Sequence, residues 1–174
     1  MEMTIPVGPD EVWADHQAGG GVPVVLLDSD SSSWESVLPG LTGRRVLRYD
    51  VRGCGRSPRP TADFTLLGDL EVVLDQLDLQ RVVLVGYSMG GSTALAYALE
   101  HPDRVRGIVL LSPTPAEAEQ DEDTYLQPDP AAYDRLHELQ VPAAVLIGDQ
   151  LASLREPQLV VDAIVRLAGD YEAG

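Results

Sequence analysis

Short apolar runs separated by polar loops and amphipathic stretches dominate the pattern of this 174-residue chain. Several runs are rich in β-branched residues and have the length of strands that are buried on both faces. The strongest are 22–27 (VPVVLL), 82–85 (VVLV), 107–112 (GIVLLS) and 142–148 (PAAVLIG), with weaker strand patterns at 11–16 and 44–50. Strands alternating with helices predict an α/β fold, a mostly parallel sheet with helices on both faces.

The helices are predicted from apolar residues at helical spacing between these strands. They cover 66–79, the segment after Gly91 and 159–167, and a short helix is expected around 34–38, after a polar loop that could cap it. The glycine-rich stretch 18–21 is expected to be a turn.

The length of the chain favours a single domain over residues 1–174. Residues 113–139 differ from the rest, because they combine several prolines with an acidic run at 117–123. We interpret 113–139 as a short lid-like excursion from the core, partly helical over 131–139.

Composition narrows the range of partners. A formal charge of −16 and a pI near 4.3 argue against nucleic acid and anionic membrane surfaces. All twelve basic residues are Arg, which excludes Schiff-base and lysine-base chemistry. The chain shows no secretory signal and no transmembrane run, and its one cysteine suits a reducing compartment, so a cytoplasmic location is expected.

The sequence G-Y-S-M-G at 86–90 carries the main chemical signal. It joins a predicted buried strand to a predicted helix, which is the context of a nucleophile elbow. Small residues at 86 and 90 allow the close backbone approach that such a turn requires. The turn would present the Ser88 hydroxyl at the top of the sheet and the Met89 N–H at a helix N-terminus, where negative charge is favoured.

Taken in order, these segments resemble the α/β-hydrolase superfamily, specifically its bacterial, esterase-like, single-domain branch. The resemblance rests on VVLL before a Ser-rich loop with Trp34, YDVRGCGRS, VVLVGYSMGG, HPDRVRGIVLLSP and VPAAVLIGD. It implies acyl transfer by a serine nucleophile that a histidine and an acid assist, with no cofactor. In the resemblance Ser88 matches the nucleophile, and Met89 matches one backbone donor of the oxyanion hole.

The chain departs from the family pattern in its early loop. Relatives carry His-Gly after the strand 22–27, whereas this chain has Asp28-Ser29-Asp30. The backbone N–H of Ser29 or Asp30 is the candidate second oxyanion donor. A carboxylate nearby would oppose a developing oxyanion, although the loop also reads as an ordinary acidic surface.

The acid and the base depart from the pattern as well. Leu151 stands where relatives carry the acid, so Asp149 is the candidate acid, with Glu156 as second choice. No histidine follows residue 148, which implies a reduced fold that lacks the last strand and helix of the family, either truncated or with an incomplete triad. Topology places all three histidines at the bottom of the sheet or on the surface, away from the serine; they are His16, His101 and His137.

Other candidates have less specific patterns. Cys54 lies between two arginines that would lower the pKa of a reactive thiol, but it is also an ordinary loop residue. Asp50 is expected to organise its loop. The acidic run 117–123 lacks His or Cys partners, so no metal site is predicted.

Three hypotheses therefore remain open for function. The first is a serine hydrolase of carboxylic esters or related acyl compounds with impaired activity. The second is an inactive hydrolase-like binding or interaction module, a pseudoenzyme. The third is a fragment completed by a partner chain, such as a homodimer formed through the exposed edge strand at 142–148.

Overall fold

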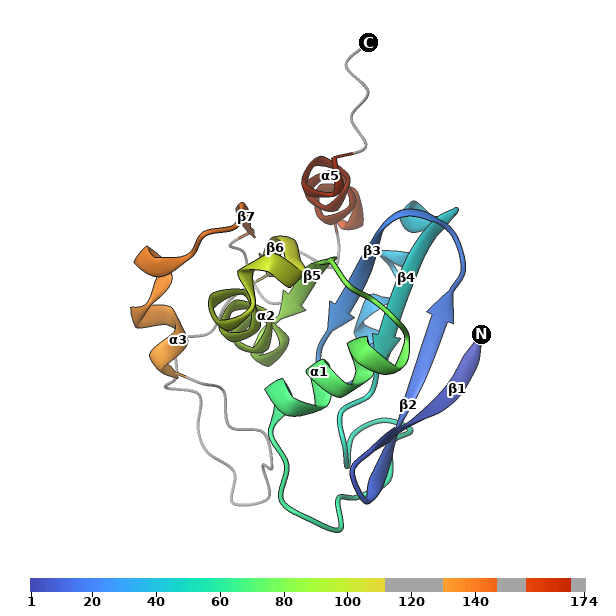
Figure 1. The fold of residues 1–174 in the computed structure, drawn as a ribbon. Coiled ribbons are helices and arrows are strands. Elements are labelled where there is room, and N and C mark those ends of the chain that lie inside the picture. The colour runs from blue at the N-terminus through green and yellow to red at the C-terminus, as the bar shows by residue number, and fades with distance from the viewer. Residues whose placement is uncertain (112–129, 147–155, 170–174) are drawn as a thin grey trace.

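The structure is a computed structural model that describes residues 1–111, 130–146 and 156–169. Its centre is one seven-stranded sheet in the order β1-β2-β4-β3-β5-β6-β7 (Figure 1). The strands are β1 (Glu2–Val7), β2 (Asp10–Gln17), β3 (Gly20–Leu27), β4 (Arg44–Tyr49), β5 (Val82–Tyr87), β6 (Val105–Leu111) and β7 (Ala143–Leu146). Strands β3 to β7 run parallel, while β2 pairs antiparallel with both β1 and β4. The mostly parallel sheet predicted from the sequence is confirmed.

Helices cover both faces of this sheet, as predicted. The α-helices are α1 (Leu66–Gln76), α2 (Met89–Glu100), α3 (Pro130–Asp134) and α5 (Pro157–Ala168). Short 3-10 helices are η1 (Ser31–Trp34), η2 (Leu38–Leu41), η3 (Pro102–Arg104) and η4 (Leu136–Glu138). Figure 1 shows α5 on one side of the sheet and α1 and α2 on the other. Within the described residues, β7 is the last strand and α5 is the last helix.

Two apolar cores lie on the two faces of the sheet. Alternate residues of each parallel strand face opposite sides, so Val82 and Leu84 pack with α1 and α2, while Val83 and Val85 pack with α5. Trp34, which has no exposed surface, fills the core under α5. A parallel sheet buried on both faces explains why the strands read as continuous apolar runs.

An ion cluster attaches α1 to the antiparallel hairpin. The Arg52 guanidinium donates to both Asp69 oxygens, at 2.8 and 2.6 Å, and to Asp10 at 2.8 Å. All three side chains are nearly buried, and the guanidinium lies 4.7 Å from the centre of the Phe64 ring. A buried charge of this kind is tolerated because every partner is hydrogen-bonded.

The sequence-based boundaries need several corrections. The first strand, β1, was not predicted, because its weak alternation includes Pro6, which is tolerated only at a sheet edge. The turn expected at 18–21 is shorter, since β3 already starts at Gly20. The helix expected at 34–38 is wrong: two 3-10 turns, η1 and η2, flank Val37, and Pro39 lies in the first turn of η2.

The excursion 113–139 is described only from residue 130. There, α3 and η4 agree with the helical character expected over 131–139. Among the described residues, no helix combines the length and apolar character needed to cross a membrane.

Candidate active site

The turn from β5 into α2 holds Ser88 in an uncommon backbone conformation. Its φ is 51° and its ψ is −114°, so it is one of two non-glycine residues with positive φ among those described. Its N–H donates to the Leu111 carbonyl at 3.2 Å, and its own carbonyl accepts from Gly91 N–H at 3.0 Å. A conformation of this kind costs free energy and persists only where the surroundings enforce it, which is why such strain gathers at functional sites.

Two glycines make this sharp turn sterically feasible. A Cβ placed on Gly86 would lie 2.2 Å from the Gly90 carbonyl oxygen, and one on Gly90 would lie 1.9 Å from the Leu27 carbonyl oxygen. Both contacts are with backbone, which cannot rotate away. The close backbone approach expected from the small residues at 86 and 90 is therefore present. Gly90 also lets the turn pack directly against the backbone at the end of β3.

Strand pairing brings the early loop beside the turn. Leu27, the last residue of β3, pairs with Gly86, so the following residues Asp28 and Ser29 run next to the elbow. A cavity of about 10 Å³ lies between the two segments. Its lining consists of Leu27, Asp28, Tyr49, Val51, Leu66, Met89, Gly90 and Thr93.

The Asp28 carboxylate accepts hydrogen bonds from two donors of its own loop. Its Oδ1 accepts from the Ser29 N–H at 2.7 Å, and its Oδ2 accepts from Ser33 Oγ at 2.6 Å. Burial raises the pKa of Asp28, the bonds from Ser33 and Ser29 oppose this, and the neighbouring Asp30 carboxylate raises it further. The candidate oxyanion donor Ser29 thus directs its N–H at a carboxylate.

The other candidate donor, Met89, is the first residue of α2. N–H groups of a first helical turn lack intrahelical partners, and the helix dipole favours negative charge there. Thr93 Oγ1 donates back to the Met89 carbonyl at 3.2 Å, which fixes this first turn. Met89 thus lies at the start of a helix, as the sequence predicts, and its role as an oxyanion donor stays a prediction.

Asp50 organises the neighbouring loops. Its side chain is fully buried, and its two oxygens accept from the N–H groups of Ser31 and Arg56, both at 2.8 Å. A Cβ on Gly55, whose φ is 50°, would lie 2.4 Å from the carboxylate. Asp50 therefore joins the loop after β3 to the loop after β4, in agreement with the organising role expected for it.

Cys54 is half-buried in the loop after β4. Burial raises the pKa of its thiol, and the carboxylates of Asp30, Asp50 and Asp28 raise it further. The neighbouring arginines do not outweigh these acids, so the structure favours an ordinary loop residue over a reactive thiol.

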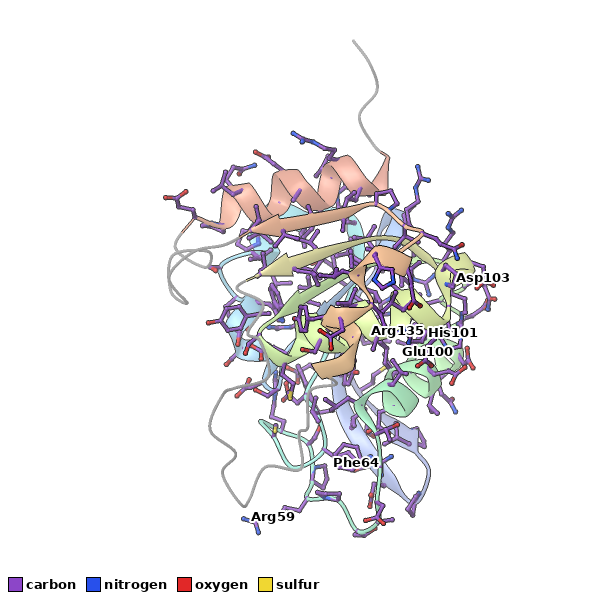
Figure 2. The ribbon with its side chains drawn as sticks, turned by 90° about the vertical axis from the view of Figure 1, so that its left-hand side faces the viewer. Arg59, Phe64, Glu100, His101, Asp103 and Arg135 are labelled. Carbon is purple, nitrogen blue, oxygen red and sulfur yellow. The ribbon has the colours of Figure 1, made fainter. Side chains whose placement is uncertain are left out.

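All three histidines of the chain lie within the described residues. His101 and His137 lie shortly before β6 and β7, at the amino ends of these parallel strands. His101 caps the far end of α2, whose 12 residues extend about 18 Å from the elbow. Figure 2 shows His101 beside Glu100 at the end of the molecule opposite the arrowheads of β5 and β6. His137 lies in η4, just before β7 begins, and its Nδ1 is 3.1 Å from the Asp134 carbonyl oxygen.

His16 is paired with β4 instead of the elbow. It lies opposite Leu47 in the β2–β4 pair, and its Nε2 accepts from Arg45 Nε at 3.1 Å. Burial lowers the pKa of His16, and the charge of Arg45 lowers it further. Since β4 and β3 separate β2 from β5, roughly 14 Å of sheet lies between His16 and the elbow strand.

The two candidate acids differ in what can be said of them. Asp149 lies outside the described residues. Glu156 is exposed and stands at the start of α5, beside Gly40 of η2. The described part of the chain contains no group of three or more His, Cys, Asp or Glu residues arranged to hold a metal ion.

Sequence reasoning missed the side chains that surround the elbow. Ser33 holds Asp28, and Ser92 Oγ donates to the Tyr133 hydroxyl at 3.4 Å, which connects α2 to α3. The alternation D-S-D-S at 28–31 could have indicated the first contact, because Asp side chains commonly accept from nearby backbone and Ser donors. No sequence signal identifies Tyr133.

Known proteins with similar sequences and folds support this description. The family model described as alpha/beta hydrolase fold matches residues 16–173. The 2-hydroxymuconate semialdehyde hydrolase of Pseudomonas sp. (strain CF600) is 39% identical over 108 aligned residues, and the match covers 55% of this chain and 38% of that protein. The (lyso)-N-acylphosphatidylethanolamine lipase of Bos taurus is 32% identical over 56% of this chain and 28% of its own. The chain spans less than half the length of these curated relatives.

Solved structures agree with the sequence relatives. Bromoperoxidase from Bacillus anthracis is 32% identical, with a TM-score of 0.61 over 70% of this chain and 48% of that chain. The enol-lactonase from Burkholderia xenovorans is 20% identical, with a TM-score of 0.72 over 96% of this chain and 100% of its own, and at this identity shows the fold alone.

Proposed function

The chain belongs to the alpha/beta hydrolase fold family, and we propose that it is a serine hydrolase of carboxylic esters or related acyl compounds with impaired turnover. The observation that carries the proposal is the conformation of Ser88. A serine at positive φ, on a strand-to-helix turn that Gly86 and Gly90 make possible, is costly to maintain without a use. The relatives named as hydrolases and lipases support acyl-group chemistry in general.

The reaction would proceed in two steps, acylation of Ser88 and hydrolysis of the acyl-serine. Ser88 Oγ forms a bond to the acyl carbon, its proton passes to solvent, and the ester C–O bond breaks as the leaving alcohol takes up a proton. Water then attacks the acyl-serine, which releases the carboxylic acid and restores the Ser88 hydroxyl. The Met89 N–H at the start of α2 would stabilise the oxyanion in both steps.

Slow turnover is expected because none of the three histidines lies beside Ser88. Removing the histidine of a serine triad lowers turnover on the order of a millionfold, and the remaining binding and oxyanion contacts leave about a thousandfold over water. Asp149 stays the proposed acid.

A fluorophosphonate probe and an activated nitrophenyl ester test this function. We expect covalent labelling of the protein and slow ester turnover, both lost in Ser88→Ala. Labelling or turnover that is unchanged in Ser88→Ala would exclude the hydrolase proposal. The positions of the histidines favour a second candidate, an inactive binding module, and a complete absence of Ser88-dependent labelling would support it.

The edge of the sheet favours a third arrangement, in which a partner chain contributes to the site. Among the described residues β7 pairs only with β6, and Val145 is 48% exposed. An open edge of this kind can pair with a strand of a second copy. Light scattering over a range of concentrations tests this: a homodimer supports it, and a monomer throughout excludes it.

A further inference from the structure

The loop after β3 differs from an ordinary surface loop in the direction of one backbone donor. The Ser29 N–H points at Oδ1 of the preceding residue, Asp28, at 2.7 Å. The other carboxylate oxygen accepts from Ser33 Oγ at 2.6 Å, so the side chain is held from two sides. On the next peptide, the Ser29 carbonyl accepts from Val51 N–H at 3.1 Å, which fixes the loop to the end of β4.

This donor lies beside the turn that holds the nucleophile. Because Leu27 pairs with Gly86, the next residues, Asp28 and Ser29, lie beside the elbow. The Asp28 backbone nitrogen would lie 2.9 Å from a Cβ placed on Gly90. Asp28 and the first residues of α2 line the same cavity. A backbone donor at this place is in position to serve an oxyanion formed at Ser88, provided that it is not already occupied.

The groups around Asp28 do not offset its negative charge. Asp30 faces it from its own loop, while Tyr49 and Cys54 approach from the β4 side, and none of these carries a positive charge. Among the described residues, the first turn of α2 contains no acidic residue, and no basic side chain lines the cavity. The Arg56 guanidinium acts on the Asp30 carboxylate and lies 3.6 Å from that of Asp50. An ionised Asp28 therefore places a negative charge beside the elbow, where it would oppose an oxyanion formed at Ser88.

We propose that Asp28 is an autoinhibitory positioning residue, which occupies the Ser29 N–H as a hydrogen-bond acceptor and thereby lowers the reactivity of Ser88. This inference rests on the proposed hydrolase function. When Asp28 is protonated or replaced, the Ser29 N–H becomes available to the oxyanion and the opposing charge disappears. Ser88 is therefore more reactive when Asp28 is protonated, in acidic solution, than when Asp28 is ionised.

A series of variants at position 28 separates the two effects. Asp28→Asn removes the charge but keeps an acceptor for the Ser29 N–H, whereas Asp28→Ala removes both. We expect Ser88-dependent ester turnover to increase about tenfold or more in Asp28→Ala, since one oxyanion donor is worth on the order of a hundredfold. A smaller gain is expected in Asp28→Asn, and both gains are lost when Ser88→Ala is added.

The matched control is Asp30→Asn. It removes the same charge two residues along the chain, from a side chain that accepts from the Ser32 N–H instead. We expect a smaller gain in turnover than in Asp28→Ala, because Asp30→Asn removes a charge but leaves the Ser29 N–H bonded to Asp28. A gain in Asp30→Asn equal to that in Asp28→Ala would overturn the specific role of Asp28.

The pH profile gives a readout that a merely structural role would not change. The ratio of Asp28→Ala to wild-type turnover should fall toward one as the pH drops through the pKa of Asp28. In the same interval the Ser29 amide signal in proton–nitrogen NMR spectra of the wild type should shift, and it should not shift in Asp28→Asn.

The outcomes distinguish this inference from the proposed function. Ser88-dependent turnover that is equal in wild type, Asp28→Asn and Asp28→Ala, with all three proteins folded by circular dichroism, overturns the inference alone. A Ser29 amide signal that is insensitive to pH also overturns it. If no variant shows Ser88-dependent turnover, the hydrolase proposal itself fails, and the inference fails with it. Should Asp28→Ala not fold, Asp28→Asn and the amide titration still decide the matter.

Discussion

The elbow 86–91 and the loop 28–33 lie side by side at the carboxyl ends of β5 and β3, yet different forces shape them. Backbone contacts shape the elbow, where a Cβ on Gly86 or Gly90 would collide with carbonyl oxygens at about 2 Å. Side-chain hydrogen bonds shape the loop, where Asp28, Asp30 and the buried Asp50 accept from neighbouring N–H groups.

This difference separates what is fixed in the site from what can change. A steric constraint does not depend on pH or on ionisation, so the elbow keeps Ser88 in place under all conditions in which the protein is folded. Hydrogen bonds to carboxylates depend on their charge, so the loop can be altered by one proton or one substitution. The nucleophile is therefore fixed, while its electrostatic surroundings are adjustable.

The steric character of the elbow predicts the largest effect on stability. Gly90→Ala would place a methyl group 1.9 Å from the Leu27 carbonyl oxygen, which forces the backbone of α2 or β3 to move. We expect a loss of more than about 4 kcal/mol in the free energy of unfolding, an exceptional value for one methyl group. Urea unfolding followed by circular dichroism measures it.

Gly91→Ala is the matched control for this prediction. The nearest atom to its added Cβ is the Gly86 carbonyl oxygen at 3.4 Å, which is ordinary contact. Its effect should stay within about 1 kcal/mol and favour the variant, because Ala has the higher helix propensity. Equal losses in both variants would contradict the steric account of the elbow.

The loop predicts a smaller loss, located at Asp50. Asp50→Ala leaves the buried N–H of Ser31 and the partly buried N–H of Arg56 without their acceptor. We expect about 2–4 kcal/mol of lost stability in urea unfolding, since each unsatisfied buried donor costs about 1–3 kcal/mol. Asp30→Ala removes only an exposed cap of η1 and should cost about 1 kcal/mol or less. A loss in Asp30→Ala as large as that in Asp50→Ala would count against the linking role of the buried carboxylate.

The two loops also differ in how far the sequence predicts them. Glycine, serine and glycine between an apolar run and a helical pattern indicate the elbow, because only small residues permit that turn, and the prediction held at Gly86, Ser88 and Gly90. The acceptor of the Ser29 N–H could not be predicted, because it depends on the side-chain conformation of Asp28, which Ser33 holds from five residues along the chain.

The same distinction applies to the fold. The buried strands were predicted from their apolar runs, since burial on both faces leaves a clear pattern. The edge strand β1 was missed, and the loop 34–38 was wrongly expected to be a helix, because exposed or irregular backbone is shaped by tertiary contacts. Asp149 lies outside the described residues, so its role as the acid stays a prediction.

Strain at the nucleophile predicts a stabilising substitution. Glycine adopts φ 51° and ψ −114° without the Cβ penalty, so Ser88→Gly should gain roughly 1 kcal/mol in the free energy of unfolding. Ser88→Ala keeps the Cβ and with it the strain, so the gain should be absent there. Thermal unfolding of the two variants provides the test, and a Ser88→Gly protein that is less stable than Ser88→Ala would contradict the strain.

The smallest expected effect compares Asp28 with Asp30, whose pKa values shift in opposite directions. Burial raises the pKa of Asp28, while the backbone hydrogen bond from Ser32 lowers that of Asp30. Where the folded pKa is raised, the folded state binds more protons than the unfolded state, so stability falls as pH rises through the interval between the two values. Where it is lowered, stability is present above the unfolded value and is lost as pH falls.

Asp28→Asn should therefore become more stable relative to wild type as the pH rises from acidic to neutral, and Asp30→Asn less stable. Unfolding free energies from urea titrations at several pH values measure both differences. An amide substitution alters hydrogen bonds at every pH, so the sign of the change with pH, and not the offset between proteins, carries the test. If the unfolding free energies of the two variants change with pH in the same way, the charge on Asp28 does not destabilise the folded loop. The loop 28–33 would then be as insensitive to pH as the elbow.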